Sequence, residues 1–348
     1  MSPHHEQMRV LIMRLGAMGD ILHALPAVAA LRQAHPDWYL GWAVEPRWSP
    51  LLRADDGQMP LVNRLHLVKA KDWARSPLQT GTLREVGALR RSLRAERYEL
   101  CIDLQGAVRS ALAGRLAGAP RMIGEDQPRE WAARWLFAER VRTHGVHVIE
   151  QAVEVCAAAA GERLSPVLPP LPVNREAELW ADGVLRDVGH QLVVLLSPGA
   201  GWGAKRWPAE RYGAVARDLH KQGCLVLVNA GPEERAIAAQ VVLVSGGVAQ
   251  APEFTLERLI ALTRRVCLVI AGDTGPLHLA CALGKPVVGI YGPTDPARNG
   301  PFGVPFRVLR HPESKRDHTR RAEPEAGLLT ITPQQVVDAA NELLAGKQ

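Results

Sequence analysis

Short apolar runs alternate with segments of helical periodicity along most of the chain. In the first half, apolar runs predict strands at residues 8–13, 39–44, 64–68 and 99–104. Helices are predicted between and after them, at residues 21–33, 82–95 and 109–117. Pro26 lies inside the first of these helices and predicts a local distortion or a later helix start. Alternation of strands and helices is typical of a parallel, doubly wound sheet.

A proline-rich segment at residues 166–174 interrupts this alternation and predicts a stiff linker. After it, strands are predicted at residues 192–196, 224–229, 266–270 and 286–291. Helices are predicted at residues 176–188, 209–222 and 256–263, and Thr332-Pro333 begins a terminal helix. We therefore expect an α/β protein with two doubly wound, Rossmann-like domains facing across a cleft. The expected domains are residues 1–170, joined by the terminal helix at 332–346, and residues 171–331.

The composition is that of a soluble globular protein, with 47% hydrophobic and 22% charged residues in a chain of 348. No apolar stretch reaches the ~18 residues that a spanning helix needs, and the N-terminus lacks the pattern of a signal peptide. We therefore expect a cytoplasmic protein. The five cysteines are an odd number without close pairs, which favours free, mostly buried thiols and predicts no metal site.

A formal net charge of +6 is compatible with nucleic acid, an anionic membrane or an anionic substrate as partner. Nucleic acid is the least favoured, because the chain has only four Phe and four Tyr residues and no aromatic-basic RNA signature. The segment 130–137, which contains Trp131 and Trp135, together with the basic stretch 69–75, allows two readings. It could lie against an anionic membrane, or it could be a packed tryptophan pair beside a solvated basic face.

The stretch from Val266 to Pro296 carries the clearest sign of a ligand site. An apolar strand leads into Asp273-Thr274-Gly275-Pro276, which supplies a polar helix cap with proline near the first turn. Such a unit presents free N–H groups at a helix start beside the carboxyl end of a strand, where α/β proteins bind anions. It predicts the phosphate-binding half of a nucleotide site. His278, one turn along, could be a core histidine or a ligand-binding one.

Two other loops follow strands. The loop Gly16–Gly19 lacks the middle glycine of a dinucleotide fingerprint, so an oxidoreductase is disfavoured. Asp20, where this loop meets the first helix, could be a helix cap or a carboxylate that accepts a proton. Lys205, in the glycine-rich loop 197–208, could bind a phosphate or be solvated.

Four motifs together resemble a known family: Met18-Gly19-Asp20, Lys205-Arg206-Trp207-Pro208, the stretch Asp273–His278, and the stretch Tyr291–Asp295. They are similar to those of the ADP-heptose:lipopolysaccharide heptosyltransferases of glycosyltransferase family nine, most of all the type that adds the first heptose to Kdo. The similarity covers nearly the whole chain in order. It implies a GT-B fold and an inverting transfer of L-glycero-D-manno-heptose from ADP-heptose, with no metal or other cofactor. The implied acceptor is Kdo of a Kdo–lipid A type molecule, reached from the cytoplasm, and the implied location is peripheral at the inner face of the cytoplasmic membrane.

The resemblance also implies roles for single residues. Asp20 is the expected general base, and Lys205 is expected to bind the diphosphate. The donor phosphates and sugar are assigned to Ser197, Asp273, Thr274, Gly275 and His278, and the ribose to Glu233 or Glu234. The acceptor is assigned to Gly19, Lys69, Lys71, Arg75 and Arg129.

Two segments depart from the family pattern. Residues 310–321 lack the cysteines that many members carry there, and residues 148–151 follow His147 where an arginine is commoner. Three alternatives therefore stay open. They are another nucleotide sugar or acceptor within the same family, a sugar-nucleotide epimerase of the same fold, and a non-catalytic nucleotide-binding module.

Overall fold

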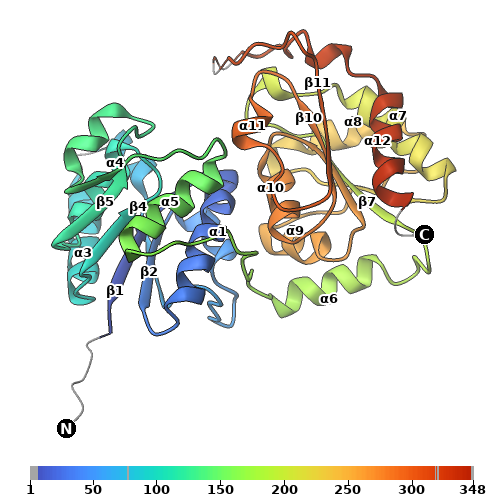
Figure 1. Ribbon diagram of the computed structural model, residues 1–348. Helices are drawn as coiled ribbons and strands as arrows, with labels where there is room; N and C mark the ends of the chain where they lie inside the picture. Colours follow the sequence, from blue (N-terminus) through green and yellow to red (C-terminus); the bar gives the residue numbers. More distant parts are fainter. Residues whose placement is uncertain (1–6, 77, 318, 320, 346–348) are drawn as a thin grey trace. The chain divides into compact units, whose positions relative to one another are not determined.

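The computed structural model describes residues 7–345, except residues 77, 318 and 320. The chain divides into two compact units, Met1–Pro172 and Val173–Gln348 (Figure 1). The division falls in the proline-rich segment, beside the boundary expected from the sequence. Each unit contains one parallel sheet covered by helices.

The first unit contains a six-stranded parallel sheet in the order β3-β2-β1-β4-β5-β6, which is the strand order of a doubly wound fold. Its strands are β1 (Arg9–Met13), β2 (Tyr39–Val44), β3 (Arg64–Leu67), β4 (Leu100–Asp103), β5 (Arg121–Glu125) and β6 (Glu139–Val141). The α-helices are α1 (Met18–Ala34), α2 (Ala70–Arg75), α3 (Thr80–Ala95), α4 (Val108–Arg115) and α5 (Val148–Ala160). Two 3₁₀ helices are η1 (Pro46–Leu51) and η2 (Trp131–Leu136).

Helix α1 is buried from Ile21 to Leu31, and it packs against α5. It runs through Pro26 without interruption, so the later start expected from that proline is wrong. The helix begins at Met18, three residues before the predicted start. Its first turn is stabilised by the Asp20 carboxylate, at the third helical position, which accepts a hydrogen bond from the Ala17 amide at 3.1 Å.

The second unit contains a five-stranded parallel sheet in the order β11-β10-β9-β7-β8. Its strands are β7 (Val193–Ser197), β8 (Leu225–Val228), β9 (Leu268–Gly272), β10 (Val287–Tyr291) and β11 (Phe306–Arg310). The α-helices are α6 (Arg175–Val184), α7 (Ala209–Lys221), α8 (Arg235–Val244), α9 (Leu256–Thr263), α10 (Gly275–Ala282), α11 (Pro296–Asn299) and α12 (Pro333–Leu344). Short 3₁₀ helices are η3 (Gly203–Lys205), η4 (Pro232–Glu234) and η5 (Leu328–Thr330).

The terminal helix α12 packs against α7 and the strands β9, β10 and β11 of the second unit. Its buried Val336 and Val337 belong to the same core as Trp207, whose indole N–H donates to the Ile331 carbonyl at 3.1 Å. The expectation that this helix joins the first domain is therefore wrong. Its apolar stripe is covered by the sheet and helix of the unit that precedes it in the chain.

Within the described residues, no helix combines the length and the apolar character that a membrane crossing requires. None of the five cysteines, all within the described residues, forms a disulfide, as expected. Four of them are buried, and Cys267 is half-buried.

Candidate functional site

Asp273 is the centre of a buried polar cluster in the second unit. It lies directly after β9, and its Oδ2 is 2.5 Å from the Nζ atom of Lys205, which η3 carries. Its Oδ1 is 3.0 Å from Nε2 of His278, which lies one turn into α10. The side chains of Asp273 and His278 are 8% and 5% exposed. Three residues assigned to the donor from sequence are thus in direct contact.

Opposing effects act on the Asp273 carboxyl. Burial disfavours its ionised form, but the hydrogen bond and charge of His278, followed by the charge and hydrogen bond of Lys205, outweigh burial and lower the pKa of Asp273 well below its ordinary value. The group is therefore a carboxylate at neutral pH. Since a carboxylate only accepts hydrogen bonds, His278 donates through Nε2–H. Asp273 consequently fixes the orientation of both the ammonium and the imidazole.

The N-terminus of α10 lies beside this cluster. Thr274 is the N-cap residue in extended conformation, but its hydroxyl donates to the Gly272 carbonyl at 3.3 Å and does not cap the helix. Pro276 occupies the first turn and has no amide hydrogen to satisfy. The Gly275 amide, at the first helical position, has no acceptor within the helix, and the start of a helix suits an anion.

The two glutamates assigned to the ribose differ in position. The Glu234 side chain is half-buried, and its Oε2 accepts from the Gly231 amide at 3.1 Å. It also lies against Gly199, where an added Cβ would stand 2.1 Å from the carboxylate, so a side chain at position 199 would displace Glu234. Glu233 is exposed. Glu234 is thus the one held against the loop that follows β7. Ser197, at the end of β7, is buried and accepts from Asn229 Nδ2 at 3.0 Å.

In the first unit, Asp20 is held by two arginines. Its Oδ1 lies 3.2 Å from Nη2 of Arg14, and its Oδ2 lies 3.7 Å from Nη1 of Arg129. The side chain is still 30% exposed. Asp20 is therefore both a helix-start acceptor, through the Ala17 amide, and a carboxylate that a substrate can reach. The two interpretations left open by the sequence are compatible.

The support beneath Asp20 comes from residues that sequence reasoning missed. The Arg14 guanidinium also donates to the Leu104 carbonyl, and Gln105 Oε1 accepts from the Leu15 amide at 2.7 Å. Gly106 has φ of +64°, and an added Cβ would be 2.9 Å from the Arg129 backbone nitrogen. The end of β4 thus holds both the Gly16–Gly19 loop and the segment of Arg129. These contacts join residues that are far apart in the sequence, so local pattern indicates no more than a turn at Gln105-Gly106.

Asp103, the last residue of β4, is also buried, at 2% exposed. Its Oδ1 accepts from the amides of Gln105 and Gly106 at 2.8 and 2.7 Å. Burial nevertheless raises the pKa of Asp103 to about 6, because desolvation outweighs these hydrogen bonds. This carboxyl therefore shapes the turn on which the Asp20 site rests.

The remaining basic residues assigned to the acceptor lie in α2 or at its N-cap and have different partners. Lys71 Nζ lies 3.6 Å from the buried carboxylate of Glu45, at the end of β2. Arg75 is exposed and pairs with Asp72 at 3.7 Å. Lys69 pairs with Glu85 at 2.8 Å, and no contact of Lys69 or Arg75 with Asp20 is found among the described residues. Gly19, in the first turn of α1, is half-buried next to Asp20.

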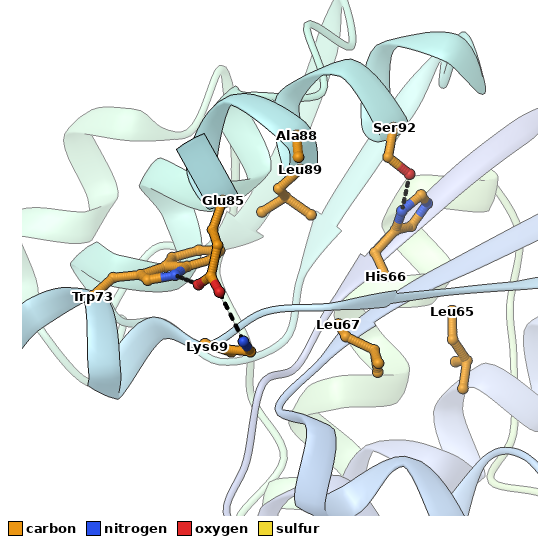
Figure 2. Close-up of a pocket in the computed structure, with 9 residues that line it drawn as sticks. All are labelled: Leu65, His66, Leu67, Lys69, Trp73, Glu85, Ala88, Leu89 and Ser92. Atoms are coloured by element: carbon orange, nitrogen blue, oxygen red, sulfur yellow. Dashed lines mark hydrogen bonds and ion pairs between the residues drawn. The ribbon is translucent and has the colours of Figure 1, made fainter. Parts of the chain in front are cut away.

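Lys69 lines a pocket of about 330 Å³ between β3, α2 and α3 (Figure 2). Glu85 accepts from both Lys69 and the Trp73 indole at 2.8 Å, at one end of the pocket. At the other end, Ser92 and His66 are 3.2 Å apart. Burial lowers the pKa of His66 to about 4, so this ring is neutral at pH 7. The remaining lining residues are Leu65, Leu67, Ala88 and Leu89.

Within the part of the chain that the structure describes, no group of three or more His, Cys, Asp or Glu side chains is placed to hold a metal ion.

The sequence matches the model of the family described as Glycosyltransferase family 9 (heptosyltransferase) over residues 86–328. It is 29% identical over 312 residues to lipopolysaccharide heptosyltransferase 1 of Escherichia coli K12, covering 88% of this chain and 94% of that protein. It is 28% identical over 300 residues to lipopolysaccharide heptosyltransferase 1 of Pseudomonas aeruginosa, covering 85% of this chain and 82% of that protein.

Solved structures agree with these sequence matches. E. coli heptosyltransferase WaaC with ADP has a TM-score of 0.77 and 25% identity, covering 97% of this chain and all of that one. A Listeria monocytogenes protein described as a UDP-N-acetylglucosamine 2-epimerase shares the fold alone, with a TM-score of 0.53 and 12% identity over 97% of this chain and 88% of that one. The expected fold class, α/β with the GT-B arrangement of two parallel sheets, is thereby confirmed.

Proposed function

The chain belongs to glycosyltransferase family 9, and we propose that it transfers L-glycero-D-manno-heptose from ADP-heptose to Kdo of the lipopolysaccharide inner core. The relatives named for this activity match most of the chain, and WaaC, at 25% identity, was solved with ADP. The observation that carries the proposal is the contact of Lys205 and His278 with Asp273 at the start of α10. A fixed cation beside uncapped helix amides is suited to the diphosphate of a nucleotide sugar.

In the proposed donor site, Lys205 and the amides at Thr274 and Gly275 bind the diphosphate. Because they are oriented before the reaction, they stabilise the negative charge that grows on departing ADP. Asp273 keeps the Lys205 ammonium in place. His278 and the buried Ser197 complete the phosphate and sugar contacts, and Glu234 accepts hydrogen bonds from the ribose hydroxyls. The last assignment follows from the contact of Glu234 with Gly199.

In the proposed acceptor site, Asp20 is the general base. It removes a proton from a Kdo hydroxyl as that oxygen attacks the anomeric carbon on the face opposite ADP, which inverts the configuration. Arg129 and Lys71 bind carboxylates or phosphates of the acceptor, with Gly19 leaving room beside Asp20. Lys69 and Arg75 contact more distant anionic groups, because neither is held near Asp20. We assign the acceptor to the first unit, which contains Asp20, and the donor to the second, which contains Lys205, Asp273 and His278.

Product analysis tests the proposal. Purified protein is incubated with ADP-heptose or UDP-N-acetylglucosamine, each with and without a Kdo acceptor, and nucleotide release and sugar products are measured. The proposal expects ADP release that depends on both ADP-heptose and Kdo, with inverted anomeric configuration, and unchanged by EDTA. Epimerisation of UDP-N-acetylglucosamine without acceptor would identify the epimerase alternative. Binding of ADP-heptose without turnover would identify a non-catalytic module.

We further propose that the protein works at the anionic inner face of the cytoplasmic membrane, because a Kdo–lipid A type acceptor is anchored there by its acyl chains. Co-sedimentation with anionic vesicles tests this location. Equal recovery with and without vesicles would contradict it.

A further inference from the structure

One surface of the first unit exposes two tryptophans close together. Trp131 and Trp135, both in η2, are 61% and 67% exposed. Their rings meet edge to face with centroids 5.5 Å apart. The guanidinium of Arg134 lies 5.4 and 5.8 Å from the two centroids. The pair is thus ordered without being buried. Indole rings exposed together mark an interaction surface, and their amphipathic character suits the boundary between water and lipid.

Helix α4 packs against η2 and extends this surface. Its exposed positions are Arg109, Leu112 and Arg115, which are spaced three residues apart and lie on one side of the helix. Leu112 is 53% exposed. An apolar side chain is therefore flanked by two guanidinium groups on the helix next to the tryptophans.

The charge of this surface is positive. Of the nearby carboxylates, Glu130 accepts from the Val108 amide at 2.9 Å, and Asp126 is paired with Arg134 at 2.8 Å. In the described part of the chain, neither Arg109 nor Arg115 forms an ion pair. A positive surface with exposed indoles complements an anionic bilayer.

The surface is also continuous with the proposed acceptor site. Arg129, whose guanidinium is 3.7 Å from Asp20, stands two residues before Trp131 in the chain. Gly106 joins the same segment to the turn before α4, since its carbonyl accepts from the Glu130 amide at 2.8 Å. A lipid-anchored acceptor held at this surface would therefore present its sugar near Asp20.

We propose that Arg109, Leu112, Arg115, Trp131 and Trp135, here named the tryptophan face, dock the first unit on an anionic lipid bilayer. The proposal rests on the proposed function, because it gives the lipid-anchored acceptor its surface. Trp131, Trp135 and Leu112 enter the headgroup region, and Arg109 and Arg115 meet the negatively charged headgroups.

Vesicle flotation tests this surface. The full chain is floated with vesicles of phosphatidylethanolamine and phosphatidylglycerol, and with phosphatidylcholine alone, at low and high salt. Trp131→Ser with Trp135→Ser is expected to weaken binding about tenfold. Arg109→Gln and Arg115→Gln should each weaken it about fivefold at low salt and less at high salt. A matched control, Leu179→Ser with Leu243→Ser, removes side chains that are 64% and 72% exposed in the second unit and should leave binding within about twofold.

Three outcomes overturn the docking proposal. The first is wild-type protein that does not float with the anionic vesicles. The second is variants of the tryptophan face that float as well as wild type. The third is loss of a dimer in the tryptophan variant by sedimentation, which would assign the face to a second copy of the chain. Quenching of tryptophan fluorescence by brominated lipids, reduced in the tryptophan variant, supports insertion.

Transfer to a deacylated, water-soluble Kdo acceptor separates this inference from the proposed function. The variants should keep wild-type turnover with that acceptor and lose it with acceptor embedded in vesicles. Wild-type protein that floats but transfers nothing to either acceptor would contradict the function and leave the docking surface standing.

Discussion

Arg14 holds Asp20 at two points. Its Nη2 lies 3.2 Å from the carboxylate oxygen Oδ1, and its Nε donates to the Asp20 backbone carbonyl at 2.9 Å. The Arg14 side chain is only 14% exposed, so it comes from beneath the site while Asp20 stays open to solvent. The proposed base is therefore held in place by a residue that a substrate does not need to touch.

Replacing Asp20 should stop the chemistry and spare the donor site. Asp20→Asn is expected to lower kcat at least about 100-fold, because a general base contributes that much or more. ADP binding, measured by calorimetry, should stay within about twofold, since the donor cluster belongs to the second unit. In this variant the side-chain oxygen of the asparagine can still accept the hydrogen bond from the Ala17 amide. Turnover within tenfold of wild type would show that another group takes the proton.

Replacing Arg14 tests whether it positions Asp20. Arg14→Gln should lower kcat about tenfold, because the carboxylate loses its fixed orientation. KM for ADP-heptose should stay unchanged. Arg14→Lys, which keeps the charge but not the two-point contact, should recover part of the activity. A rise in KM without a fall in kcat would mean that Arg14 binds substrate instead of positioning the base.

The ion pair of Lys205 with Asp273 allows a double-variant test. Lys205→Met leaves a buried carboxylate with one partner fewer, so it should lower the free energy of unfolding by on the order of 3 kcal/mol. Adding Asp273→Asn should restore most of that stability, because the unpaired charge is gone. Activity should stay at least about 100-fold low in both, since the diphosphate has lost its cation. Urea unfolding and steady-state kinetics measure the two effects. Recovery of activity together with stability would contradict the proposed role of Lys205.

Glu233 and Glu234 are neighbours that serve as each other's controls. Glu234→Gln should weaken ADP binding about tenfold, the cost of replacing a charge-assisted hydrogen bond to the ribose. Glu233→Gln should change it less than about twofold, because that side chain is exposed. Calorimetric titration with ADP gives both values. The opposite order would assign the ribose to Glu233.

Asp103 should make the stability of the first unit depend on pH. Its pKa is raised by burial to about 6, above the ordinary value of 3.8. Between these two values the folded state binds more protons than the unfolded state, so this group's contribution to stability falls as pH rises from about 4 to 6. Asp103→Asn removes that dependence and keeps an acceptor for the Gln105 amide.

Comparing urea unfolding of wild type and Asp103→Asn at pH 4, 5, 6 and 7 tests this expectation. The stability of the variant relative to wild type should rise by on the order of 2 kcal/mol from pH 4 to pH 7. A constant difference over this range would show that Asp103 titrates normally in the folded protein.

Much of the fold follows from local sequence. The apolar runs at β1, β2, β7, β9 and β10 are buried on both faces of their sheets, so they stand out as continuous hydrophobic segments. Strands β5, β6 and β11 were not predicted. The residues of the edge strands β6 and β11 are largely exposed or half-buried, and β6 has only three, so they lack that signal. Strand β5 is internal, but only its three central residues are buried, which is a short apolar run. The partner of α12 was predicted wrongly because an amphipathic helix does not specify which surface covers it.

Local sequence patterns and motifs predict the strand–helix alternation, the linker, and the candidate residues Asp20, Lys205, Asp273 and His278. These signals are local, since strand burial, helix starts and glycine-rich turns act over a few residues. The folded structure was needed to show that Lys205 and His278 both contact Asp273, that Arg14 supports Asp20, and that Trp131 and Trp135 are exposed beside α4. Each of these features depends on segments that are distant in the sequence and that the strand order brings together. For example, β1 pairs with β4, and the residues that follow these strands, Arg14 and Leu104, are joined by a hydrogen bond. The hydrophobic pattern of the chain predicts the strands and helices, but contacts between distant segments arise only when the strands pair in the sheet.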